Sequence, residues 1–251
     1  CRGRCRWVAP RVRGPMKVVT LASVRGAPGV TTTSLLLAST FADGLVVEAD
    51  LDGGVFAIRY GLGREPGLTT FAAAGPDNGS GWRAHAQGAG GVPVLVGPDA
   101  PSASAALWRT AGERITHQLV ASDGVAVVDA GRLRTPSPIV AASDLLAILV
   151  HPVAEQLVAL THLVPVLPQA ARGQAVVVLV GDGPYRRADV EGSIGMRVVG
   201  ELPDDPGAAE ALRTGGASRA RLSRSRLVRA VAALGEDIGA SLLEPVAGAV
   251  S

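Results

Sequence analysis

The stretch VRGAPGVTTTS, residues 24–34, lies between a run of β-forming residues at 17–23 and a run of leucines. Gly26, Pro28 and Gly29 suit a tight turn that leads into a helix beginning near Thr31. In such a loop the backbone N–H groups can approach an anion, and the N-terminus of the following helix adds a favourable partial charge. The stretch therefore predicts a phosphate-binding loop between a strand and a helix.

The lysine that should follow the last glycine of such a loop is absent. Val30 stands at that position. The only lysine in the chain, Lys17, lies at the start of the first β-forming run, far from the mouth of the loop, and cannot substitute. Arg25 is the one cation left in the loop. Thr31 occupies the position from which a hydroxyl would ligate Mg²⁺, and Thr32 can donate to an α-phosphate. The loop thus keeps its amides and hydroxyls and lacks its main phosphate-binding cation.

From Met16 onward, short apolar runs alternate with longer segments of helical period, which predicts a mainly parallel α/β sheet. Most of the runs are continuously apolar, so we expect a single doubly wound sheet with helices on both faces. The strands are expected at 17–23, 45–50, 92–97, 124–130, 145–151, 175–181 and 196–202. The helices are expected at 31–42, 102–120, 153–168, 185–193, 207–214 and 220–243, and the glycine-rich segment 75–91 is expected to be a mobile loop.

The first fifteen residues differ in composition from the rest of the chain. They hold five arginines, both cysteines and no acidic residue, so we expect 1–15 to be a disordered basic leader that is not native and 16–251 to be one domain. Without the leader, 19 basic residues face 22 acidic ones, and the net charge changes from +2 to −3. Overall charge therefore gives no argument for nucleic-acid binding. The absence of cysteine from 16–251 excludes disulfides and thiolate zinc sites there and fits a cytoplasmic protein.

Carboxylates follow two of the predicted strands. Glu48 and Asp50 are two residues apart at the end of the second strand, so both side chains can point into one cleft. Asp129 ends a buried apolar strand, where an aspartate that orders Mg²⁺ would be placed. Ligands of doubly wound sheets bind at the carboxyl ends of the strands, so these residues are candidates for a metal site.

Together, these motifs resemble the ParA/MinD group of P-loop ATPases, which partition chromosomes and plasmids, place division sites or position appendages. RGAPGVTTT resembles the deviant Walker A loop of that group, VVEADLDGG its second acidic motif, and VAVVDAG its Walker B strand. SDLLAILVHPVAEQLVAL resembles the strand and helix that follow, and VVGELPDDPGAAEALRTGG resembles a late segment beside the nucleotide. The resemblance covers almost all of the chain from Met16 to about Leu243.

The resemblance implies ATP and Mg²⁺ as ligands and gives each matching residue a role. Arg25 replaces the lysine that reaches across a nucleotide-sandwich dimer, and Val30 replaces the Walker lysine. Thr31, Glu48 and Asp129 would hold the metal and its water shell, and Asp50 would orient the attacking water. Nucleotide-binding positions implied in this way are Arg25, Gly26, Ala27, Pro28, Gly29, Val30, Thr31, Thr32, Asp204 and Asp205.

Loss of the Walker lysine leaves three functions open. The protein is a positioning or partitioning switch that binds ATP and hydrolyses it weakly, a scaffold that binds no nucleotide and acts through protein contacts as in pilus or secretion assembly, or an active ATPase in which Arg25 supplies the missing charge. An asparagine that would read adenine is also replaced, near Asp182 and Gly183, which leaves the base preference open.

Partner surfaces are suggested by the last predicted helix. Leu227, Val231, Leu234 and Ile238 form one apolar stripe, which favours a helix packed on the sheet. Arginines gather along the same segment and leave open a patch for non-specific DNA; they are Arg219, Arg221, Arg224, Arg226 and Arg229. The tail after Leu243 has no basic residue, so membrane binding is not expected. The resemblance also implies a nucleotide-dependent homodimer and a further protein partner, while the histidines show no zinc-ligand spacing.

Overall fold

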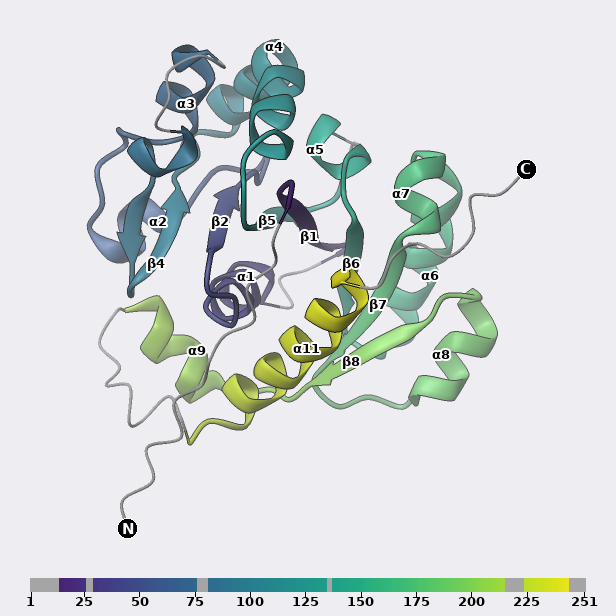
Figure 1. Ribbon diagram of the computed structural model, residues 1–251. Helices are drawn as coiled ribbons and strands as arrows, with labels where there is room; N and C mark the ends of the chain where they lie inside the picture. Colours follow the sequence, from purple (N-terminus) through teal and green to yellow (C-terminus); the bar gives the residue numbers. More distant parts are fainter. Residues whose placement is uncertain (1–13, 26–28, 76–80, 135–136, 215–223, 244–251) are drawn as a thin grey trace.

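The computed structural model describes residues 14–25, 29–75, 81–134, 137–214 and 224–243 (Figure 1). Nearly all of the predicted leader therefore lies outside the described residues. Within them, Pro15 forms an isolated antiparallel bridge with Asp123, and Met16 is buried. The first described strand, β1, begins directly after Met16.

One eight-stranded sheet forms the centre of the described structure, with the strand order β3-β4-β2-β5-β1-β6-β7-β8. All neighbouring strands are parallel except β3 and β4. The strands are β1 (Lys17–Ser23), β2 (Gly44–Glu48), β3 (Gln87–Ala89), β4 (Val92–Leu95), β5 (Val125–Arg132), β6 (Leu145–Val150), β7 (Ala175–Val180) and β8 (Val198–Leu202). The predicted doubly wound, mainly parallel sheet is confirmed.

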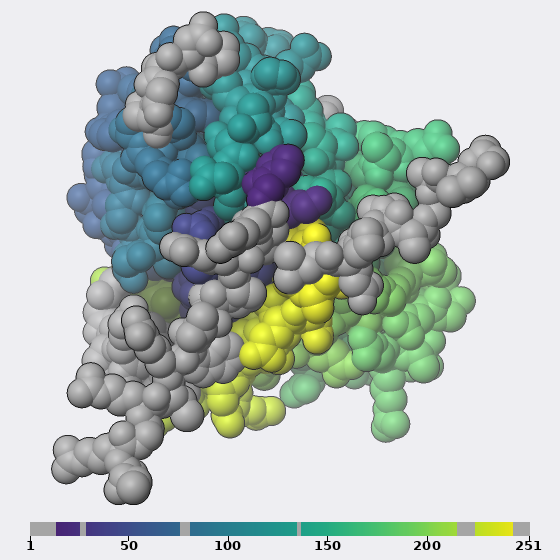
Figure 2. Space-filling view, viewed as in Figure 1, coloured from purple at the N-terminus to yellow at the C-terminus, as the bar shows by residue number. Residues whose placement is uncertain are grey.

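Helices cover both faces of this sheet. The first face carries α3 (Leu68–Ala74), α4 (Pro101–Val120), α5 (Pro138–Ala141), α6 (Ala154–Leu163), α7 (Gln169–Gly173) and α8 (Arg187–Ile194). The second face carries α1 (Val30–Ala38), α2 (Phe56–Tyr60), α9 (Pro206–Arg213) and α11 (Arg226–Leu243), and α11 runs along the surface in Figure 2. Two short 3₁₀ helices, η1 (Gly81–Ala84) and η2 (Val164–Val166), complete the described elements. None of the helices found in these ranges is long and apolar enough to cross a membrane.

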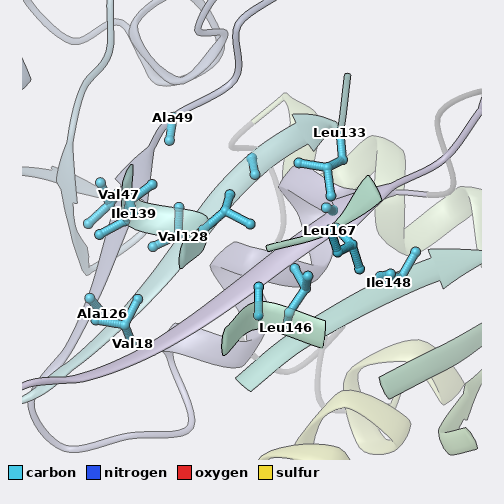
Figure 3. Close-up of a cluster of buried hydrophobic side chains, with 14 of the residues drawn as sticks. Val18, Val47, Ala49, Ala126, Val128, Leu133, Ile139, Leu146, Ile148 and Leu167 are labelled. Atoms are coloured by element: carbon cyan, nitrogen blue, oxygen red, sulfur yellow. The ribbon is translucent and has the colours of Figure 1, made fainter. Parts of the chain in front are cut away.

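Each face of the sheet has its own apolar core, because successive strand residues point to opposite sides. In β1, Val18 belongs to the cluster on the first face and Val19 to the cluster on the second. Figure 3 shows part of the first cluster, in which Val128 of β5 lies near Ile139 of α5 and Ile148 of β6 lies near Leu167. Strands that are buried on both faces explain the continuously apolar runs in the sequence.

The segment 75–91 differs from the prediction of a mobile loop. Residues 76–80 lie outside the described residues, but η1 places Trp82 in the core, and β3 pairs with β4 as an antiparallel edge strand. Gly90 and Gly91, with φ of 58° and 88°, form the two-residue hairpin turn between these strands. Two consecutive residues with positive φ are what such a turn requires, so the pair of glycines was a hairpin signal.

Several helices were predicted to be longer than the observed ones. The segment predicted as one helix at 153–168 consists of α6 and then η2, because Pro165 and Pro168 cannot continue an α-helix. The helix predicted at 31–42 ends at Ala38, where α1 gives way to a turn at Thr40. The last helix, predicted from residue 220, begins at Arg226, and part of the predicted range lies outside the described residues.

Candidate functional site

The predicted phosphate loop joins the end of β1 to the start of α1. Gly26, Ala27 and Pro28 lie outside the described residues, whereas Gly29 has a left-handed φ of 80° and directly precedes α1. The Gly29 carbonyl accepts the first helical hydrogen bond, from the Thr33 amide at 2.8 Å. Residues with a side chain rarely adopt this backbone conformation, so a glycine at position 29 allows the chain to enter the helix without strain. Arg25 is exposed at the other end of the loop.

Val30 lies where the lysine of a phosphate loop would be, and its side chain is part of the core. It is 6% exposed and belongs to the apolar cluster that also contains Leu227 and Val231 of α11. An isopropyl group in this cluster contributes to stability through burial of apolar surface. At this position the chain thus has a packing contact in place of the cation that the family resemblance implies.

Two of the carboxylates predicted to form a metal site come together where β2 pairs with β5. Glu48 and Asp129 are direct partners in the parallel register, and the Ala49 amide donates to the Asp129 carbonyl at 2.8 Å. Both side chains are 1% exposed, and Asp50 follows on the same strand end. No lysine or arginine in the described part of the chain forms an ion pair with Glu48 or Asp129. Among the described residues, Glu48 and Asp129 thus have no paired countercharge, whereas Arg134 acts on Asp50.

Glu48 is held by backbone amides from two other segments. Its Oε1 accepts hydrogen bonds from the amides of Val55 and Phe56, the latter at 2.9 Å, and its Oε2 accepts one from the Gly97 amide at 2.9 Å. Burial raises the pKa of Glu48, and these three amides oppose that rise. The bonds tie the end of β2 to the first turn of α2 and to the segment after β4. Glu48 therefore has a structural role, which the family resemblance did not suggest.

Asp129 and Thr31 meet at the centre of the site. The Thr31 hydroxyl donates to the Asp129 carboxyl, and the Gly131 amide donates to its Oδ1 at 3.1 Å. Burial, with Asp50 and Glu48 nearby, raises the pKa of Asp129 from 3.8 to about 7. A carboxyl group in this state would release its proton to solvent when a cation binds beside it, because the cation stabilises the charged form.

This raised pKa predicts a pH dependence of stability. The folded protein keeps a proton on Asp129 that the unfolded chain has already lost, so this contribution is complete below about pH 4 and is lost as pH rises through about 7. Asp129→Asn should remove that dependence and stabilise the metal-free protein at pH 8 by more than about 1 kcal/mol relative to its effect at pH 5. Urea unfolding at both pH values, with exposed Glu236→Gln as the control, measures this. Equal effects of Asp129→Asn at pH 5 and pH 8 would contradict the raised pKa.

Asp50 is half-buried and faces the backbone that follows Asp129. Its Oδ1 accepts from the Asp52 amide at 2.8 Å, and Asp52 in turn pairs with Arg134 at 3.1 Å. Burial, with the Asp52 charge, raises the pKa of Asp50. A Cβ at Gly131, where φ is 56°, would lie 2.1 Å from the Asp50 carboxyl, so glycine is needed there for this close approach. Asp50 is thus placed beside Asp129 without bonding to it.

Asp204 and Asp205, predicted to lie near a nucleotide base, are found in different settings. Asp205 caps α9, accepting from the Ala208 amide at 3.0 Å and from the Ser225 hydroxyl at 2.7 Å. Asp204 is exposed beside Gly181, where a Cβ would lie 2.7 Å from its Oδ2. Both line a cavity of about 160 Å³ that extends to α1; its lining includes Gly29, Thr32, His151 and Leu227.

His151 also lines this cavity and makes structural hydrogen bonds. Its Nδ1 bonds the Val180 carbonyl at 2.8 Å, and its backbone amide donates to Gln156 at 2.9 Å. The described ranges contain no cluster of three histidine, cysteine or acidic residues arranged to hold a metal by themselves.

The chain's own groups fit magnesium better than they fit a nucleotide base. Mg²⁺ in phosphate-binding proteins takes one or two carboxylates together with phosphate oxygens, and Thr31 and Asp129 provide a hydroxyl and a buried carboxyl without a basic neighbour. The cavity beside Asp204 is smaller than the roughly 300–1,000 Å³ of common ligand pockets. A base would thus have to widen the cavity or lie partly outside it.

Comparison with known proteins supports the fold strongly. No protein-family model matches the sequence, and no curated protein matches it significantly. The structure is similar to that of a ParA family ATPase from Chlorobium tepidum TLS, with a TM-score of 0.73 and 16% identity over 88% of this chain and 98% of that one. It is also similar to the septum site-determining protein MinD from Pyrococcus horikoshii OT3, complexed with Mg-ADP. Here the TM-score is 0.69, with 14% identity over 89% of this chain and 96% of that one. For Cyanothece McdA(D38A) in an ATP complex, the TM-score is 0.63, with 16% identity over 94% of this chain and 100% of that one.

At these identities the similarity establishes the fold. The chain has the eight-stranded, mainly parallel fold of the ParA/MinD ATPases, and the resemblance drawn from its motifs is confirmed at that level. The roles of individual residues remain predictions. The motifs did not single out Arg59 and Tyr60 of α2, which line a crevice beside Thr31 and Thr32. A helix of five residues is too short to show a helical period in the sequence.

Proposed function

We propose that this chain, which has the fold of the ParA/MinD ATPases, is a nucleotide-binding positioning or partitioning switch that binds ATP with Mg²⁺ and hydrolyses it slowly or not at all. In this proposal the backbone at the start of α1 holds the phosphates. Thr31 and Asp129 hold the magnesium and its waters, and Glu48 fixes the loops around them. Asp50 orients the attacking water. The Mg²⁺ would screen the phosphate charge.

The observation that carries the proposal is the buried acidic cluster beside the start of α1. Asp129 is buried, lies near two further carboxylates, and touches Thr31 of the predicted phosphate loop. Keeping Glu48 and Asp129 buried without a paired countercharge among the described residues costs free energy, which a divalent cation would offset. A scaffold that had lost its ligand would gain stability near neutral pH by replacing Asp129, whose charged form is disfavoured by burial.

A second function, a scaffold that binds no nucleotide, is favoured by two observations. Val30 is packed into the core instead of carrying a charge, and the cavity beside Asp204 holds about 160 Å³. Both reduce what the site offers to a triphosphate. The third function, an active ATPase, depends on Arg25, which is exposed next to residues outside the described ranges.

Partners of the switch follow from the same proposal. We expect a nucleotide-dependent homodimer in the cytoplasm and an unidentified protein partner. The stripe on α11 is buried as predicted, whereas Arg224, Arg226 and Arg229 are exposed and remain candidates for non-specific DNA contacts. Arg219 and Arg221 of the same predicted patch lie outside the described residues. DNA retention that falls steeply with salt and is lost on replacing the three exposed arginines by alanine would support the patch.

Steady-state phosphate release separates the three functions once MgATP binding has been measured. The switch should release phosphate slowly or not at all, and any release should be lost in Asp50→Ala, because that residue is proposed to orient the water. Fast release that disappears in Arg25→Ala would favour the active ATPase. Release that survives Asp50→Ala would contradict the role of Asp50, and absence of binding would leave the scaffold.

A further inference from the structure

Two arginines from other elements lie beside the first turn of α1, at a crevice that shares Thr32 with the cavity beside Asp204. Arg59 of α2 and Arg213 of α9 line a crevice of about 10 Å³ together with Thr31 and Thr32. Because the crevice is this small, the side chains around it are already in close contact. Two arginine residues therefore lie near the turn from which the Walker lysine is missing.

The helix that carries Arg59 is fixed in place from both ends. At its start, the Val55 and Phe56 amides donate hydrogen bonds to Glu48, and Phe56 is fully buried. At its other end, the Tyr60 hydroxyl donates to the Leu212 carbonyl of α9 at 2.6 Å, and the Tyr60 ring stacks on Phe56 at a centroid distance of 6.0 Å. The backbone of Arg59 is thus held beside α1, while its side chain is half-exposed.

The two arginines differ in their charge environment. Arg213 pairs with Glu210 on its own helix, with 2.7 Å between Nη2 and Oε1. Arg59 forms no ion pair with any residue in the described ranges. Of the two, Arg59 is the cation whose charge is not already balanced by a neighbouring carboxylate, so it is the one available to an anionic ligand.

We infer that Arg59 supplies, from α2, the positive charge that Val30 no longer provides to the phosphates of a bound nucleotide. The inference rests on the proposed function, because it needs a nucleotide at the start of α1. A guanidinium suits the task, since it stays charged and can bind two phosphate oxygens at once. The long side chain can turn from the crevice towards a phosphate on Thr31 and Thr32 without movement of α2. Arg59 is a binding residue in this scheme, separate from the acidic cluster that holds magnesium.

Equilibrium binding of MgATP to five proteins tests the inference: wild type, Arg59→Ala, Arg59→Lys, Arg213→Ala and Val30→Lys combined with Arg59→Ala. Loss of a hydrogen-bonded charge should weaken binding of Arg59→Ala by roughly tenfold to a hundredfold. Arg59→Lys should retain part of the affinity, and Arg213→Ala should bind within about threefold of wild type, because Arg213 is already paired. Adenosine, which has no phosphate, should bind wild type and Arg59→Ala equally.

The combined variant distinguishes a charge effect from a structural one. If Arg59 acts through its charge on the phosphates, a lysine at position 30 should restore most of the affinity that Arg59→Ala loses. The inference would be overturned if the wild type binds MgATP and Arg59→Ala binds it equally well, or if Arg213→Ala loses as much affinity as Arg59→Ala. Either result would leave the proposed function intact. Absence of MgATP binding by the wild type would overturn both. Melting temperatures without ligand should agree among the wild type and the three single variants at Arg59 and Arg213, since Phe56 and Tyr60 still hold α2.

Discussion

Glu48→Ala is expected to lower the free energy of unfolding by at least about 3 kcal/mol. The substitution leaves three backbone amides, those of Val55, Phe56 and Gly97, without their acceptor, and each buried donor that loses its partner costs about 1–3 kcal/mol. The loss should also free the first turn of α2 from the end of β2. Urea unfolding followed by circular dichroism measures the change.

Two further variants make this prediction specific. Glu48→Gln should be affected less, because its amide oxygen still accepts hydrogen bonds, and Glu201→Ala should be close to neutral, because Glu201 is exposed on edge strand β8. A Glu48→Ala protein as stable as the wild type would show that the carboxylate does not hold these loops. The residue would then be free for the metal-binding role that the family resemblance implies.

Val30→Lys should raise the rate of ATP hydrolysis by about tenfold or more. Removal of one preorganised donor from an active site costs roughly a hundred- to a thousandfold in rate, and a restored lysine at the start of α1 should recover part of that. The recovery should be incomplete, because Val30 now packs in the core and a lysine there gives up apolar contacts. Phosphate release at saturating ATP measures the effect.

Val30→Met is the matched control for this variant, since it is also long and flexible but carries no charge. It should leave hydrolysis unchanged, and Val30→Lys combined with Asp50→Ala should lose the gain. An unchanged rate for Val30→Lys in a protein that binds MgATP would mean that the lost lysine is not what limits hydrolysis here.

Most of the fold could be predicted from the sequence because the central strands are buried on both faces. Their apolar runs give unambiguous strand signals, and β1 was predicted with its observed bounds, 17–23. The peripheral elements were harder. The helix α2 has five residues and β3 has three, so neither shows a period, and their positions depend on contacts such as Glu48 with the Phe56 amide.

For the candidate site, the sequence predicted which residues come together but not what each one bonds. Glu48, Asp50 and Asp129 do meet, because parallel strands end at the same edge of a sheet. The motif pattern alone did not distinguish a carboxylate open to a metal from one held by amides of distant segments. The same limit applies to Asp205, which caps α9, and to Arg59, whose position beside α1 depends on the Tyr60 contact with α9.

The most direct test of the account is thermal unfolding of the full chain in the presence of MgATP. Ligand at a hundred times its dissociation constant stabilises the folded state by about 2.7 kcal/mol, which for a domain of this size corresponds to roughly 5–10 °C in melting temperature. We predict such a shift with MgATP, a smaller one with ATP and a chelator, and a loss of the difference in Asp129→Asn. An unchanged melting temperature at millimolar MgATP would contradict the central claim that this site still binds a nucleotide.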